Sequence, residues 1–208
     1  MAYTDFTTTA KLAAIYVGYF GRAADPEGFV YWEDDFATRV ADGATEQDAL
    51  IAVAQSFAND TEAQATYSYL ADPDTGDVGA FIDAIYQNLF GHAADAAGKD
   101  YWTGYLSDAD AGELTVGKFI LAVMEGAIGT DLTVLENRAA VSEYYAANYD
   151  ADVWENNPTF LAEARNILSG VTDDPSTVED AKADVDVIIS GGETFTLTEA
   201  IEAAATEE

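Results

Sequence analysis

The stretch FGRAADPEGFVYW, Phe20–Trp32, decides the fold, because the chain repeats it as FGHAADAAGKDYW, Phe90–Trp102. When both copies are extended back to the preceding Ile-Tyr pair, they agree at ten of eighteen positions without a gap. A catalytic motif is rarely duplicated intact, whereas a structural corner often is. We therefore predict an internal duplication of about seventy residues.

The identical residues suit a corner between two helices. Gly21 and Gly91 can end a helix in the left-handed conformation, and Asp25 and Asp95 can cap the next one. The two further glycines would let helices approach closely, and the aligned basic residues would bond nearby carbonyls or pair with an acid. The predicted structural motif comprises Gly21, Arg22, Asp25, Gly28, Trp32, Gly91, His92, Asp95, Gly98 and Trp102.

The remaining sequence is predominantly helical in pattern. Predicted helices cover residues 11–20, 26–40, 46–57, 61–70, 81–90, 116–128, 132–149, 160–168 and 178–189, and one more follows the cap at Asp95 and carries Tyr101, Trp102 and Tyr105. We predict an all-α fold with two related helical repeats, residues 1–70 and 71–150, and a C-terminal helical extension, residues 151–189. Residues 190–208 read as a linker or the start of a following module, and ETFTLT within them alternates like a strand.

Composition excludes several classes of function. The chain has 39 acidic against 8 basic side chains, a formal charge of −31, so we expect no nucleic-acid partner and no adhesion to anionic lipid. No apolar run approaches the roughly eighteen residues of a membrane span, so we expect no direct membrane insertion. The N-terminus lacks the pattern of a cleavable secretory signal. Cysteine is absent and there is one histidine, which leaves oxygen-ligated calcium as the favoured metal.

Two acidic loops are candidate calcium sites. In the first, the carboxylates fall at positions 1, 3, 6 and 12, a degenerate version of a helix–loop–helix calcium loop. The second has similar spacing. The candidate ligands are Asp72, Asp74, Asp77 and Asp83 in the first loop, and Asp108, Asp110 and Glu113 in the second. The alternative for both is an acidic turn between helices.

Aromatic residues are numerous for so polar a chain, and aromatic faces can stack on sugar rings. A dense local set, Tyr144, Tyr145, Tyr149 and Trp154, is therefore a candidate glycan-binding surface, with core packing as the alternative. Catalysis is not indicated. Glu33 to Asp35 would fan around a helix instead of facing each other across a glycosidic bond, and no G-x-S-x-G motif occurs.

The phrase G-R-x-x-D-x-x-G-x-x-Y-W after an Ile-Tyr helix resembles the helical domain of unknown function found in bacterial surface proteins. The resemblance covers residues 7–148. It implies an N-terminal region of a type I-secreted RTX or S-layer protein, ahead of calcium-binding repeats, and anchoring to lipopolysaccharide. The second copy departs from the family at His92, where the family favours arginine. Because RTX nonapeptides do not occur in this sequence, we expect it to be the N-terminal part of such a protein, or a protein without those repeats.

We therefore expect a non-enzymatic, secreted module that anchors a larger protein to the cell surface by binding an envelope glycan, with calcium assisting. One alternative is a self-assembly module in which copies of the chain form a calcium-dependent lattice or filament. A second alternative is an enzyme acting on extracellular polysaccharide.

Overall fold

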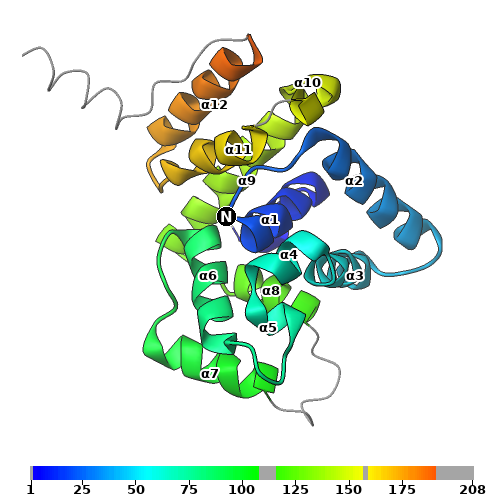
Figure 1. The fold of residues 1–208 in the computed structure, drawn as a ribbon, viewed down its shortest axis with the longest axis vertical. Coiled ribbons are helices and arrows are strands. Elements are labelled where there is room, and N and C mark those ends of the chain that lie inside the picture. Colours follow the sequence, from blue (N-terminus) through cyan, green and yellow to red (C-terminus); the bar gives the residue numbers. More distant parts are fainter. Residues whose placement is uncertain (1, 108–115, 157–158, 191–208) are drawn as a thin grey trace, which may run out of the picture.

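The computed structural model describes residues 2–107, 116–156 and 159–190, and within these ranges it contains twelve α-helices, one short 3-10 helix and no strand (Figure 1). The predicted all-α fold is therefore confirmed. The predicted strand-like phrase, residues 193–198, lies outside the described residues. None of the described helices has the length and apolar character that a membrane span requires.

In chain order the elements are η1 (Tyr3–Asp5), α1 (Thr8–Phe20), α2 (Pro26–Ala41), α3 (Glu46–Ala58), α4 (Thr61–Thr66), α5 (Ser68–Ala71), α6 (Val78–Phe90), α7 (Ala96–Ser107), α8 (Val116–Glu125), α9 (Thr130–Asn148), α10 (Ala151–Asn156), α11 (Phe160–Ser169) and α12 (Pro175–Ile189). Several of these boundaries differ from the prediction by about three residues, and two of the differences have a clear structural reason. The helix expected over residues 61–70 is split at Tyr67, whose extended backbone (φ −118°, ψ 112°) separates α4 from α5. The last helix begins at Pro175, three residues early, because Asp174 caps it by accepting from the Ser176 N–H (2.9 Å).

Both copies of the repeated phrase form the predicted corner. Helix α1 ends at Gly21 (φ 58°) and α6 ends at Gly91 (φ 84°), each in the left-handed conformation. Asp25 caps α2 by accepting from the Gly28 N–H at 2.7 Å. Asp95 makes the equivalent bond at the start of α7, also at 2.7 Å. The capping and glycine predictions are confirmed.

The two repeats pack like against like, with α1 against α6 and α3 against α8. Glycines permit both contacts. A Cβ atom added to Gly18 would lie 3.2 Å from Leu89 on α6, and one added to Gly117 would lie 2.5 Å from the carbonyl oxygen of Ile51 on α3. One hydrophobic core, which runs from Tyr3 to Ala146, therefore contains side chains of both repeats.

The C-terminal extension adds a second core on one end of the molecule. Helices α11 and α12 lie side by side against α9 (Figure 1), and their apolar faces bury Val17 of α1 and Tyr145 of α9. Two backbone N–H groups of the first corner donate hydrogen bonds to α11 and α9. The Ala23 N–H donates to the carbonyl of Ala164 on α11 (2.9 Å), and the Ala24 N–H donates to Oγ of Ser142 on α9 (2.9 Å).

Two buried tyrosines give a matched test of this packing. The Tyr67 hydroxyl donates to the Tyr19 carbonyl (2.6 Å) and accepts from the Asn88 amide (3.1 Å). The Tyr19 hydroxyl is buried and has no hydrogen-bond partner in the described part of the chain. We expect Tyr67→Phe to cost about 1–3 kcal/mol in the free energy of unfolding, because it strands a buried carbonyl and an amide. Tyr19→Phe should leave the free energy of unfolding unchanged or raise it.

Urea denaturation of the two variants beside the wild type measures the difference. Equal losses from both substitutions would show that the hydroxyl of Tyr19 has a partner and that this account of the core is wrong.

Candidate functional site

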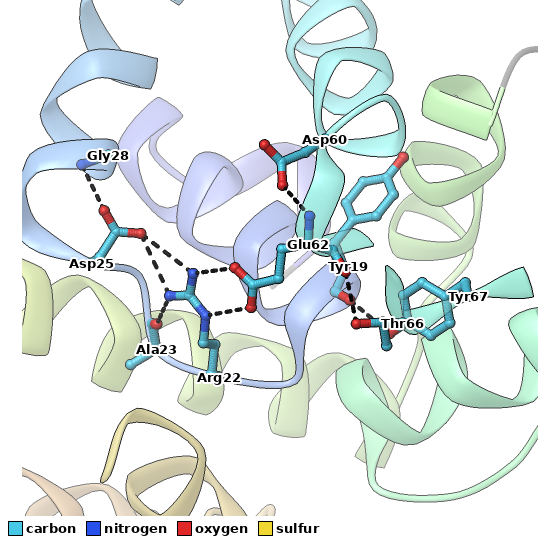
Figure 2. Close-up of polar contacts among 9 residues, drawn as sticks. All are labelled: Tyr19, Arg22, Ala23, Asp25, Gly28, Asp60, Glu62, Thr66 and Tyr67. Atoms are coloured by element: carbon cyan, nitrogen blue, oxygen red, sulfur yellow. Dashed lines mark hydrogen bonds and ion pairs between the residues drawn. The ribbon is translucent and has the colours of Figure 1, made fainter. Parts of the chain in front are cut away.

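The side chain of Arg22 lies buried in the first corner, where it is 3% exposed, and joins two helices (Figure 2). Its Nη1 donates to the Ala23 carbonyl (3.0 Å), while Nε and Nη2 donate to the two carboxylate oxygens of Glu62 on α4 (3.3 and 3.1 Å). Oδ2 of Asp25 lies 3.5 Å from both Nη1 and Nη2. Burial acts to lower the pKa of Arg22, but the bonds and charges of Glu62 and Asp25 outweigh it, so the pKa is raised.

His92 repeats this arrangement in the second corner. Its Nδ1 lies 2.8 Å from the Ala93 carbonyl and its Nε2 lies 3.0 Å from Oδ1 of Asp131. Asp131 is the second residue of α9, as Glu62 is the second residue of α4. Because both ring nitrogens face acceptors, the geometry favours the doubly protonated imidazolium. The pKa of His92 is accordingly raised, first by the Ala93 carbonyl and then by Asp131.

The predicted roles of Arg22 and His92, bonding a carbonyl and pairing with an acid, are confirmed. Sequence reasoning missed the acids themselves. The signal that could have found them is the acidic residue in the first turn of the helix that follows each repeat's third helix. The predicted close approach at Gly28 is also confirmed, since an added Cβ atom would lie 2.4 Å from the Tyr16 hydroxyl. Gly98 is less tightly enclosed, with Tyr86 at 3.7 Å.

A small pocket of about 110 Å³ opens beside Arg22. It is lined by Tyr16, Phe20, Arg22, Asp25, Trp32, Phe57, Asp60 and Glu62. His92 does not line it, so the two corners do not form one shared binding cavity there. A volume this size admits a few waters, each occupying about 30 Å³ in the liquid, and not a sugar chain. This pocket therefore gives the corner no glycan site, and the contacts of Arg22 within it serve to hold the helices together.

The aromatic set predicted as a glycan surface lies largely inside the second core. Tyr145 and Tyr149 are 0% and 6% exposed, so neither offers a ring face to solvent in this structure. The Tyr144 hydroxyl donates to Asp186 on α12 (2.8 Å). The half-buried Trp154 ring packs against the Phe160 ring, with the ring centroids 3.8 Å apart. These residues contact each other and α11 and α12, which is the arrangement of a core.

A different aromatic pair is exposed in both repeats. Tyr31 on α2 and Tyr101 on α7 occupy the same position of the repeated phrase, and each is 61% exposed. Each ring packs edge-on against the tryptophan that follows it, with centroids 4.9 Å apart at Trp32 and 4.8 Å apart at Trp102. The signal for these tyrosines was in the sequence, because both belong to the ten identical positions.

The first acidic loop engages its carboxylates with protein donors. Asp72 accepts from the Thr75 hydroxyl (2.7 Å) and the Asp74 N–H (3.2 Å), and the Thr75 bond is the main cause of its lowered pKa. Asp77 caps α6 by accepting from the Ala80 N–H (2.8 Å). This is the geometry of an acidic turn that starts a helix.

Asp83 pairs through Oδ2 with Nζ of Lys99, and its Oδ1 is buried without a hydrogen-bond partner among the described residues. Within residues 2–107, 116–156 and 159–190, no group of three or more acids and histidines is placed to hold a metal ion. Calcium at the first loop stays a prediction, and it requires Asp77 and Asp83 to leave these bonds. The second candidate set lies outside the described residues: Asp108, Asp110 and Glu113.

Comparison with known proteins gives one match. Residues 54–125 match a family model described as "Domain of unknown function (DUF4214)". The match covers about a third of the chain, crosses the predicted boundary between the repeats and contains the whole second corner. The resemblance to a helical domain of unknown function is thus confirmed for that stretch, while the RTX and S-layer context stays a prediction. No curated protein and no solved structure matches the chain.

The His92–Asp131 pair predicts a pH dependence of stability. The raised pKa means that the folded protein holds its proton where the unfolded chain, at about 6.5, has begun to lose it. The stabilisation is therefore complete below about pH 6.5 and is lost as the pH rises through the folded value. The side chain is 52% exposed, so the effect should stay below about 1 kcal/mol.

The measurement is the difference in unfolding free energy between the wild type and His92→Gln from pH 5.5 to 9. We expect that difference to shrink with rising pH. The variant His92→Arg should keep its stability over the whole range, because arginine, like Arg22 in the first corner, stays charged. A difference that grows with pH would contradict the pairing.

Proposed function

We propose that the chain is a non-enzymatic module that holds a secreted protein of the S-layer or RTX type at the cell surface by binding an envelope glycan. The proposal rests on the resemblance of the repeated phrase to that class of surface proteins. It also rests on the partial match to a helical domain of unknown function. The observation that carries it is the exposed tyrosine at the same position of each repeat.

Tyr31 and Tyr101 suit a sugar ligand for physical reasons. An exposed tyrosine offers a flat apolar face and a hydroxyl while losing little side-chain entropy on binding. The neighbouring Trp32 and Trp102 are half-buried and hold each tyrosine ring edge-on, so part of the surface is ordered before the ligand arrives.

Two equivalent surfaces also suit a polymer. A glycan with repeating units can engage both tyrosine positions at once, and the second contact is then intramolecular and strengthens the overall binding. Stacking on an uncharged sugar needs no basic residue, which agrees with the formal charge of −31.

The test uses smooth lipopolysaccharide, which carries the O-chain, and rough lipopolysaccharide, which lacks it. We expect the protein to sediment with the smooth form, and Tyr31→Ser/Tyr101→Ser to weaken that binding at least about tenfold, as truncation of aromatic anchors does. Each single variant should lose less than the double variant. The matched control is Val30→Ser, which removes a 57% exposed apolar side chain from α2 and leaves both rings.

Unchanged binding by the double variant would overturn the tyrosine surface. Ordered sheets or filaments formed without glycan would instead favour the self-assembly alternative. Release of reducing sugar from the polysaccharide would favour the enzyme alternative.

A further inference from the structure

Two arginines of this acidic protein have no acidic partner among the residues that the structure describes. The chain has 8 basic side chains among 39 acidic ones, so an arginine meets carboxylates easily. Arg22, Arg39 and Lys99 each pair with at least one. Arg138 and Arg165 form no ion pair with any residue in the described ranges, and both line the same pocket. Their shared position points to an acidic ligand that the protein itself does not supply.

Arg138 of α9 is held rigidly at the back of this pocket and is 9% exposed. Its Nη1 donates to the Gln87 and Asn88 carbonyls (2.9 and 2.6 Å), and its Nε donates to the Val171 carbonyl (3.3 Å). Nη2 makes no hydrogen bond to a described residue and lies beside Gly91, where an added Cβ atom would be 3.2 Å away. The carbonyls orient the guanidinium group, and its charge is left without a carboxylate.

Arg165 of α11 has no such structural task. It is exposed, and it makes no hydrogen bond or ion pair with any residue that the structure describes. The pocket that it shares with Arg138 has a volume of about 290 Å³. Its lining residues are Gly21, Gln87, Asn88, Arg138, Arg165, Asn166, Leu168 and Ser169. The side-chain amides of Gln87, Asn88 and Asn166 therefore line the pocket together with the two guanidinium groups.

One wall of the pocket is fixed before any ligand binds. The Asn88 amide donates to the Gly18 carbonyl (2.9 Å) and the Tyr67 hydroxyl (3.1 Å), which orients the side chain. Gly21 leaves the space beside it open, since an added Cβ atom would lie 2.6 Å from Oδ1 of Asn88. The left-handed glycine of the first corner thus serves both the turn and the pocket.

We infer that this pocket binds a monosaccharide-sized ligand carrying a carboxylate or a phosphate, with Arg138 and Arg165 on the anion and the Gln87 and Asn166 amides on its hydroxyl groups. The exposed Arg165 can offer its planar donors to the oxygens of either anion, whereas Arg138 offers Nη2, because its Nη1 and Nε already donate to carbonyls. The volume of about 290 Å³ falls just below the range of about 300–1,000 Å³ for small-molecule sites, so it suits a ligand of about one sugar unit.

The net negative charge does not prevent this binding. At physiological salt the Debye length is about 8 Å, so carboxylates elsewhere on the surface are screened from a ligand inside the pocket. Arg138 and Arg165 line the pocket itself, so their charges lie nearer to a bound ligand than those screened carboxylates do. The inference stands apart from the proposed tyrosine surface, because none of the pocket residues is part of it.

The experiment titrates the folded chain with four probes at 0.15 M salt, followed by NMR: galacturonate, glucose 1-phosphate, inorganic phosphate and neutral galactose. We expect both sugar acids to bind more tightly than phosphate, and galactose not to bind. Arg165→Gln should lower the affinity for the sugar acids at least about tenfold. Its free energy of unfolding should not fall, because no group in the described part of the chain loses a hydrogen-bond partner. The charge-matched control is Arg39→Gln, outside the pocket, which should bind as the wild type does.

Three results would overturn the inference: equal binding of galactose and galacturonate, wild-type affinity in Arg165→Gln, or an equal loss in Arg39→Gln. Phosphate binding as tightly as the sugar phosphate would overturn the part that assigns amides to sugar hydroxyls. The variant Tyr31→Ser/Tyr101→Ser should keep the anion affinity, so the pocket and the tyrosine surface can fail separately.

Discussion

The buried guanidinium of Arg22 is the interaction on which the arrangement of helices depends. It lies between the corner that joins α1 to α2 and the first turn of α4, and it donates to both carboxylate oxygens of Glu62. A buried charge that lost its partner would be strongly destabilising, so this pair fixes where α4 begins relative to α1. The same corner is bonded to α9 and α11 through Ala24 and Ala23. One short phrase thereby fixes the relative positions of five helices: α1, α2, α4, α9 and α11.

The second copy of the phrase is a looser version of the same device. The His92 side chain is 52% exposed, whereas that of Arg22 is 4% exposed, and α11 bonds to the first corner through Ala23. A solvent-exposed pair is screened and contributes little to stability, so the second corner tolerates histidine, whose charge depends on pH, in place of arginine. Duplication followed by the addition of one layer explains why two nearly identical phrases differ in burial.

Local features were predictable from the sequence, and contacts between distant segments were not. Gly21, Asp25 and their counterparts followed from helix-end chemistry, which involves neighbours only. Glu62 was missed because periodicity does not say which acid a corner will meet 40 residues later. Tyr145 was placed in a candidate glycan surface, with core packing as the alternative, because a local set of aromatic residues does not show which helices will cover it; Tyr145 packs in the core formed with α11 and α12. Arg138 and Arg165 are joined only by the packing of α9 and α11.

The central claim is that the repeated phrase folds helices together through its buried basic residue. A double-mutant cycle on Arg22→Gln and Glu62→Gln, measured by urea unfolding, tests it most directly. The account predicts that each single variant is destabilised and that the pair is coupled by at least about 1 kcal/mol, as contacting residues in one network are. The equivalent cycle on His92 and Asp131 should give a smaller coupling. Additive effects of Arg22→Gln and Glu62→Gln, with no coupling between them, would contradict the account.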